Sequence, residues 1–77
     1  MMDWIEVEER LPEKNDIYLV TWTGTLGSKR TRPFIALVEY IPEDNEWCTF
    51  EIEGHGYKNI EVIAWMPVPD PYKKGES

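Results

Sequence analysis

Cysteine and histidine are almost absent from this chain of 77 residues, which has one of each, Cys48 and His55. One cysteine cannot form a disulfide within the chain, and a free thiol is consistent with a reducing compartment. A zinc site needs about three or four converging ligands, so no metal or other cofactor is expected. Neither a membrane-spanning apolar run nor a signal-peptide pattern is present. The sequence therefore predicts a cytoplasmic protein.

Positive charge is also scarce, because eight lysines and arginines stand against fifteen aspartates and glutamates, for a net charge of −7. Phosphate backbones attract Lys and Arg, so direct binding to double-stranded nucleic acid is not expected. A strongly acidic surface is attracted to basic surfaces of other proteins. The charge therefore favours a partner with a basic surface, and the alternative is that it serves solubility alone.

Aromatic side chains are plentiful: four Trp, four Tyr and two Phe. Each buried aromatic removes roughly 150–250 Å² from water, which gives a short chain an efficient core. We therefore expect a single small β domain over residues 1–72, followed by a polar tail at residues 73–77. Three alternating prolines at Pro67, Pro69 and Pro71 force an extended path that ends the last strand.

Runs of β-branched and aromatic residues predict four strands, with a fifth at the N-terminus. Short connections without a crossover helix predict an antiparallel meander of four to five strands, in a mainly β fold with a curled sheet or a small, partly open barrel. The second strand is apolar on both faces, which predicts that both are covered. Glycines and basic residues predict a loop at residues 24–33. The expected strands are residues 4–8, 17–23, 34–41, 46–52 and 59–65.

The fourth expected strand carries the cysteine, and Cys48, Phe50 and Ile52 are expected to face the core. Trp47 lies on the other side of this strand, either half exposed or packed on Tyr40 across the Pro42–Asn45 turn. A thiolate–imidazole pair of Cys48 with His55 would need hydrogen-bond contact and an oxyanion donor. A buried, inert cysteine is the preferred interpretation, and no catalytic residue or enzyme activity is expected.

Two blocks at the ends of the chain resemble a known family. Residues 4–12 read Trp-Ile-x-Val-x-x-Arg-Leu-Pro, and residues 65–71 read Trp-Met-Pro-x-Pro-x-Pro. Both resemble the phage- and prophage-associated family called domain of unknown function 551, although Ala64 stands where that family usually has His, so no role of that histidine carries over. The resemblance implies a phage or mobile-element origin and no known chemistry.

We interpret these two blocks as structural. Trp4 and Trp65 are expected to pack together and hold the termini over the sheet, with Leu11 and Met66 beside them. A ligand site built from the same residues is the alternative interpretation.

The preferred functional hypothesis is a non-enzymatic phage accessory protein that binds a host protein, as in counter-defence. The binding face is expected to be acidic, and an uncovered sheet edge or aromatic patch suggests a homodimer as well. The residues assigned to the acidic face are Glu39, Glu43, Asp44 and Glu46.

The alternative is a homo-oligomer that sequesters a small phosphorylated nucleotide. Arginine pairs bidentately with phosphate, and an aromatic ring can stack on a base. The glycines of the basic loop match no known phosphate-loop spacing, which favours a plain solvated loop. The residues assigned to this alternative are Lys29, Arg30 and Arg32 for the phosphate, and Trp22, Trp47 or Tyr57 for the base.

Overall fold

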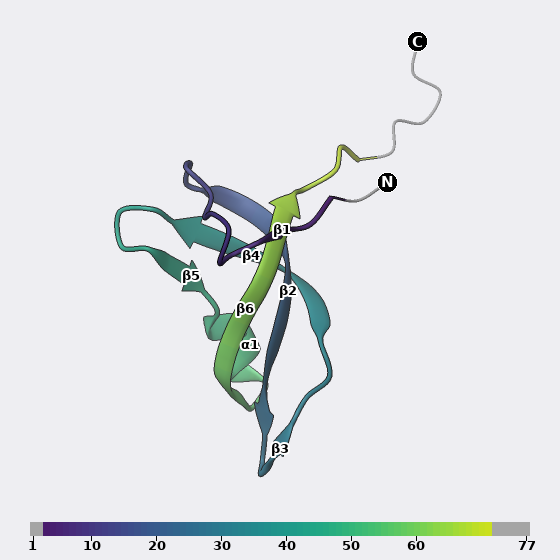
Figure 1. The fold of residues 1–77 in the computed structure, drawn as a ribbon. Coiled ribbons are helices and arrows are strands. Elements are labelled where there is room, and N and C mark those ends of the chain that lie inside the picture. The colour runs from purple at the N-terminus through teal and green to yellow at the C-terminus, as the bar shows by residue number, and fades with distance from the viewer. Residues whose placement is uncertain (1–2, 72–77) are drawn as a thin grey trace.

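The chain folds into one antiparallel sheet of six strands that carries one short helix (Figure 1). The computed structural model describes residues 3–71, and the tail predicted at 73–77 lies outside them. Five strands lie in the order β1-β6-β2-β4-β5, and β3 pairs with the far end of β2. The elements in chain order are β1 (Ile5–Glu6), β2 (Asp16–Leu26), β3 (Lys29–Arg30), β4 (Phe34–Ile41), β5 (Glu46–Cys48), α1 (Phe50–Gly54) and β6 (Tyr57–Pro67).

The predicted mainly β, antiparallel class is confirmed, and the sheet is not closed into a barrel. The strand order differs from a simple meander, because the last strand, β6, lies between β1 and β2. β6 pairs along nearly the whole of β2, from Tyr18 opposite Pro67 to Leu26 opposite Tyr57. The two longest strands therefore form the centre of the sheet.

The core lies on one face of the sheet. Alternate residues of β2 point to the same side, so Tyr18, Val20 and Trp22 are all buried there. Val20 and Tyr40 are the largest side chains that are fully buried. Strands β4 and β6 add the remaining large members, which are Val38, Tyr40 and Trp65.

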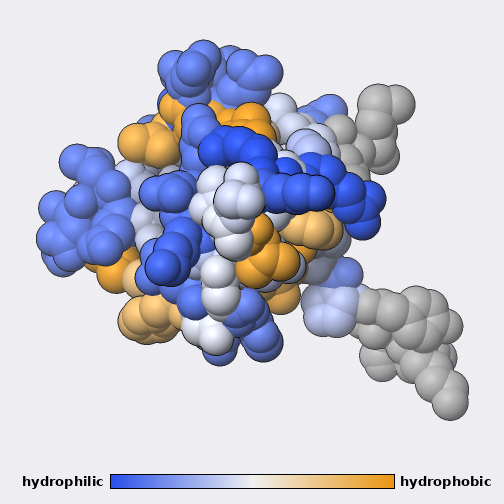
Figure 2. Space-filling model, turned by 90° about the horizontal axis from the view of Figure 1, so that it is seen from below, coloured by the Kyte–Doolittle hydropathy of each residue, from blue (hydrophilic) through white to orange (hydrophobic). Residues whose placement is uncertain are grey.

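The opposite face of the sheet is bare over β4 and the start of β2. Ile17, Ile35 and Leu37 point to this side and are 52%, 60% and 60% exposed. The prediction that both faces of the second strand would be covered therefore fails at Ile17, whereas Leu19 and Thr21 on the same side are half-buried and Thr23 is 7% exposed. Ile5 and Val7 from the N-terminal segment and Ile52 from α1 all pack on the core side, so the short chain forms one covering layer. Figure 2 shows hydrophobic side chains reaching the surface between hydrophilic ones.

The strand predicted over residues 46–52 ends at Cys48 and gives way to α1. Thr49 starts the helical turn: its carbonyl accepts from the Glu53 amide at 3.0 Å, and its hydroxyl lies 3.1 Å from a Glu53 carboxylate oxygen. Cys48 and Phe50 were both predicted to face the core, and both predictions are wrong. Cys48 is half-buried and lies opposite Glu39 on the other face of the sheet, while Phe50 is 72% exposed because the helix turns it outward. The predicted contact of Trp47 with Tyr40 is confirmed, with ring centroids 4.6 Å apart.

The two end blocks of the sequence meet around Trp65. Ile5 lies opposite Trp65 in the β1–β6 pair, and the Trp65 indole N–H donates to the Arg10 carbonyl at 2.9 Å. Trp4 was expected here, but alternation places Trp4 and Ile5 on opposite faces of the chain. Met66 likewise points away from the core, beside Leu19 in the β2–β6 register. The two blocks do meet, but the predicted packing of Trp4 on Trp65 with Leu11 and Met66 beside them is wrong: Ile5 and Arg10 are the partners of Trp65, and Leu11 is 38% exposed.

The predicted loop at residues 24–33 is mostly a hairpin. Strand β2 continues to Leu26, and Gly27 adopts φ +65° in the turn before β3. The Thr31 amide donates to the Gly24 carbonyl at 2.9 Å, which closes the hairpin onto β2. The basic cluster therefore lies on a paired strand and the segment directly after it.

No helix within residues 3–71 combines the length and the apolar character that crossing a membrane would need.

Candidate functional site

The four carboxylates predicted to form a binding face lie together on the β4–β5 hairpin. Glu39 is on β4, Glu43 and Asp44 are in the turn, and Glu46 begins β5 opposite Ile41. All four are exposed. Figure 1 shows this hairpin projecting from the side of the sheet. We call these four residues and the turn that carries them the acidic hairpin.

The turn of the acidic hairpin has the four residues predicted, Pro42 to Asn45. The Asp44 amide donates to the Ile41 carbonyl and the Asn45 amide to the Pro42 carbonyl, both at 3.2 Å. Asn45 adopts φ 50°, a left-handed conformation that asparagine tolerates better than most residues. The Tyr40 hydroxyl lies 3.3 Å from the Asn45 side-chain oxygen, which ties the turn to the core. The carboxylates are thus held by a defined turn.

The negative charges of the acidic hairpin act on the pKa of the Cys48 thiol. Partial burial raises the pKa of Cys48, and the charges of Glu39, Glu46 and Asp44 raise it further. Each effect disfavours the thiolate, which is the reactive form. The cysteine is therefore expected to be a poor nucleophile near neutral pH.

The effect of these carboxylates on the Cys48 pKa can be tested directly. Replacing Glu39 and Glu46 by lysine removes two of the charges that raise the Cys48 pKa, so alkylation by iodoacetamide should reach half its maximal rate at a lower pH. Cys48 is the only cysteine, so the rate reports one site. The same two changes at the exposed Glu8 and Glu9 are the control. An unchanged midpoint in the hairpin variant would show that these carboxylates do not act on the thiol.

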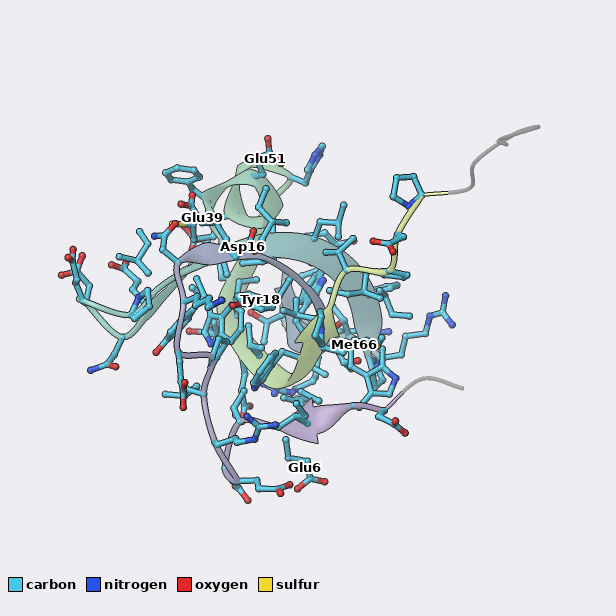
Figure 3. All side chains as sticks on the ribbon, turned by 90° about the horizontal axis from the view of Figure 1, so that it is seen from above. Glu6, Asp16, Tyr18, Glu39, Glu51 and Met66 are labelled. Carbon is cyan, nitrogen blue, oxygen red and sulfur yellow. The ribbon has the colours of Figure 1, made fainter. Side chains whose placement is uncertain are left out.

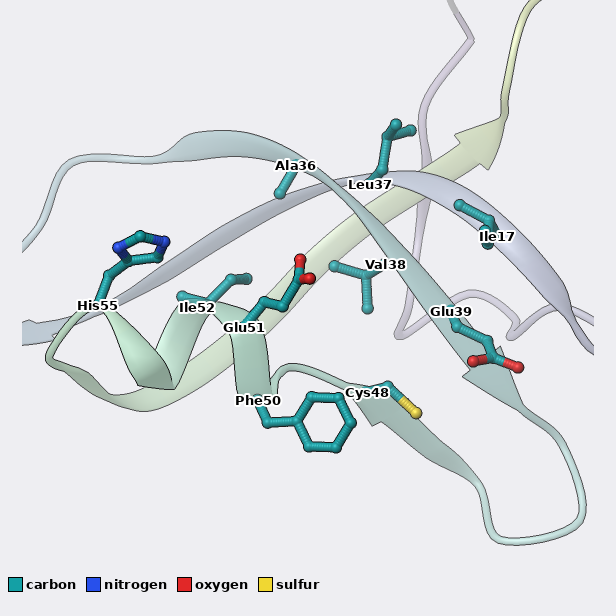
Figure 4. Close-up of a pocket in the computed structure, with 10 residues that line it drawn as sticks. All are labelled: Ile17, Ala36, Leu37, Val38, Glu39, Cys48, Phe50, Glu51, Ile52 and His55. Atoms are coloured by element: carbon teal, nitrogen blue, oxygen red, sulfur yellow. The ribbon is translucent and has the colours of Figure 1, made fainter.

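A groove of about 580 Å³ runs between β4 and α1 (Figure 4). Ala36, Val38 and Ile52 line it from the core side, and Leu37 and Ile17 line it from the bare face. Glu39, Cys48 and Phe50 lie at the end next to the acidic hairpin, and Glu51 stands over the middle. The floor is therefore apolar and two carboxylates lie on the rim.

Cys48 and His55 both line this groove but lie toward opposite ends of it (Figure 4). No hydrogen bond joins them among the residues that the structure describes. Between residues 3 and 71 there is also no group of three His, Cys, Asp or Glu residues placed to hold a metal ion.

Sequence reasoning missed the contribution of α1 to this groove. Phe50, Glu51 and Ile52 alternate in polarity, and this alternation predicts a strand. A helix signal was nevertheless present, because Thr49 is a residue type favoured at helix N-caps, acidic Glu51 and Glu53 follow in the first turn, and Gly54 ends the run.

The residues of the alternative nucleotide site are divided between two places. Arg30 donates to the Thr23 hydroxyl at 2.6 Å and forms an ion pair with Glu61 at 2.9 Å. The Arg32 guanidinium lies 5.1 Å from the Phe34 ring centroid, and Lys29 is exposed on β3. Arg30, one of the two arginines assigned to the phosphate, is thus already paired with a carboxylate.

The aromatic residues of that alternative also lie in two places. Trp22 is buried and contacts Tyr57, with ring centroids 5.2 Å apart, so both belong to the core at the basic end. Trp47 lies elsewhere, between Tyr40 and Tyr18. The nucleotide alternative stays a prediction: Arg32, Trp22 and Tyr57 gather around Phe34 near Lys29 and Arg30, and Trp47 alone of the assigned residues lies elsewhere.

Fold and site together define a small β protein with one open sheet, a bare apolar face and an acid-rimmed groove. The family model for a protein of unknown function, DUF551, matches residues 3–73, so the chain belongs to this family. The match spans both end blocks, which the structure brings together around Trp65. Comparison with curated proteins and with solved structures gives no match.

Proposed function

We propose that this chain is a non-enzymatic accessory protein that binds a partner protein with a basic surface through its acidic hairpin. The observation that carries the proposal is the gathering of Glu39, Glu43, Asp44 and Glu46, all exposed, on one projecting hairpin. Opposite charges at an interface speed encounter and select partners more than they add affinity. The groove beside the hairpin supplies apolar surface, which charge alone does not provide.

The setting that fits this proposal is the cytoplasm of a bacterial host. A free cysteine stays reduced in a reducing compartment, and the end blocks of the sequence suggest a phage or prophage origin. In that setting a small binding protein with no chemistry of its own would act by occupying a host protein, as a counter-defence factor does.

The proposal is tested by partner capture from bacterial lysate with three forms of the protein. The parent is compared with a variant in which the four carboxylates of the acidic hairpin are changed to lysine. A matched variant has the same change at four exposed carboxylates elsewhere, Glu6, Glu8, Glu9 and Asp70. Both variants have the same net charge, so they differ only in where the charge lies.

We expect the hairpin variant to recover at least about tenfold less of a specific partner, because like charges then face each other across the interface. The matched variant should keep most of the binding. Raising the salt from about 0.05 to 0.5 M should weaken capture by the parent, since screening shortens the reach of exposed charges. Equal losses in the two variants would assign the binding to net charge and contradict the proposal.

A further inference from the structure

Part of the β4 edge has no strand partner. β5 pairs with β4 only at Glu39, Tyr40 and Ile41, and within residues 3–71 the stretch from Phe34 to Val38 is paired with β2 alone. An open edge presents backbone N–H and C=O groups in a row, which is a template for another strand. The groove begins at this edge, since Ala36, Leu37 and Val38 form one of its walls.

Apolar side chains are available on both sides of this edge. Successive residues of an added strand point to opposite faces of the sheet. On the groove side the apolar residues of an added strand would meet Val38 and Ile52. On the bare face the aliphatic stems of alternating Lys or Arg residues would cover Ile35 and Leu37, each 60% exposed, with their charged ends toward Glu39. Phe50, 72% exposed at the mouth of the groove, would be covered by the same strand. The edge therefore offers contacts for side chains as well as for backbone.

The charges around the edge select what kind of strand fits. Glu39 and Glu51 both line the groove, and the acidic hairpin continues from Glu39. Figure 3 shows Glu39 and Glu51 on the same side of the molecule, with Glu6 on the other. None of the residues lining the groove is a lysine or arginine. An acidic segment would be repelled here, and lysine or arginine side chains would be attracted.

We propose that an extended segment of the partner protein, in which apolar residues alternate with Lys or Arg, adds as a strand to the Phe34–Val38 edge of β4. This proposal rests on the proposed function and specifies how its partner is held. Backbone hydrogen bonds along the edge supply affinity, and the groove and its carboxylates supply specificity, as in other strand-addition complexes. α1 forms the far wall and keeps the added strand against the sheet.

The test uses the full chain and a labelled nine-residue peptide in which Val and Lys alternate. Binding is followed by fluorescence anisotropy, and amide hydrogen exchange is followed residue by residue by NMR. Two further peptides are N-methylated at every second residue, one in each phase, and a fourth has Glu in place of Lys. We expect slower exchange of amides within Phe34–Val38, at least about tenfold weaker binding of one N-methylated peptide through lost backbone hydrogen bonds, and no binding of the Glu peptide.

Two protein variants locate the site. Leu37→Lys places a cation at the edge and is expected to weaken peptide binding at least about tenfold, since lysine is a common block on natural sheet edges. Leu26→Lys makes the same change at a residue of similar exposure, 49%, outside the groove, and should bind like the parent. The NMR spectrum of each variant shows whether it is folded.

Three results would overturn the strand-addition proposal. The first is equal binding of both N-methylated peptides and the parent peptide. The second is protection of amides outside β4. The third is protection of Phe34–Val38 that grows with protein concentration without peptide, together with a mass above 9.1 kDa by light scattering, which would assign the edge to a second copy of the chain. The lysate experiment stands apart from all three, because it depends on the acidic hairpin and not on the edge.

Discussion

Trp65→Ala is expected to remove a large share of the free energy of unfolding. The Trp65 side chain is 4% exposed, packs edge-on against Tyr18 with ring centroids 5.1 Å apart, and donates to the Arg10 carbonyl. Replacing a buried tryptophan by alanine costs about 3–5 kcal/mol. A domain of this length has a total stability of about 4–12 kcal/mol. Ile5 packs against the core that contains Trp65, so the loss of the indole also weakens the hold on β1.

The measurement is urea unfolding followed by circular dichroism, with Trp65→Phe as the control. Phenylalanine keeps most of the apolar contact and loses the indole N–H, so we expect a smaller loss of about 1–2 kcal/mol, largely from the unpaired Arg10 carbonyl. Trp47→Ala should also cost less than Trp65→Ala, because Trp47 is half-buried. A loss below about 1 kcal/mol for Trp65→Ala would show that the two end blocks do not hold the fold together.

Gly24→Val is the second change expected to have a large effect. A Cβ atom at Gly24 would lie 2.9 Å from the Lys58 carbonyl oxygen and 3.1 Å from the Ile60 Cδ1 atom. The first contact is to backbone of the neighbouring strand β6, which cannot move aside as a side chain can. The β2–β6 register shifts at this point, between Thr23 and Thr25, so glycine permits the close approach of the two longest strands. We expect a loss of about 2–3 kcal/mol from overpacking.

In a domain of this size, such a loss lowers the melting temperature by roughly 10–20 °C, which calorimetry measures directly. Gly54→Ala is the matched control, since no atom lies within 4 Å of a Cβ built there and Gly54 ends α1. Its stability should stay within about 0.5 kcal/mol of the parent. A similar melting temperature for Gly24→Val and Gly54→Ala would mean that β6 shifts to make room at Lys58.

The acidic hairpin is the part of the site that the sequence predicts best. Pro42, Asp44 and Asn45 are residue types typical of a tight turn. Because this turn is short, the two strands that it joins lie next to each other whatever the rest of the fold. The carboxylates come from within eight residues, so their grouping needs no knowledge of distant contacts. The packing of Trp47 on Tyr40 is predictable for the same reason, because it follows from the local hairpin register.

The groove could not be predicted, because it depends on two facts that the local pattern leaves open. The first is that residues 50–54 turn into a helix, which moves Phe50 to the surface and Ile52 to the core. An apolar–polar alternation of three residues fits one turn of helix as well as a strand. The second is that β5 stops at Cys48, and this leaves the Phe34–Val38 edge of β4 without a second neighbour.

By itself, the sequence determined the β class, the central strand, the β4–β5 hairpin and the meeting of the two end blocks. Each follows from side-chain type, alternation or turn chemistry over a few residues, and the end blocks follow from large apolar side chains that need burial. Only the tertiary structure decided that β6 inserts between β1 and β2, that Trp65 takes Ile5 and Arg10 as partners, and that one face of the sheet stays bare over β4 and the start of β2. Strand order and the covering of a face depend on which distant segments compete for the same apolar surface, and a chain of 77 residues can cover one face more completely than two.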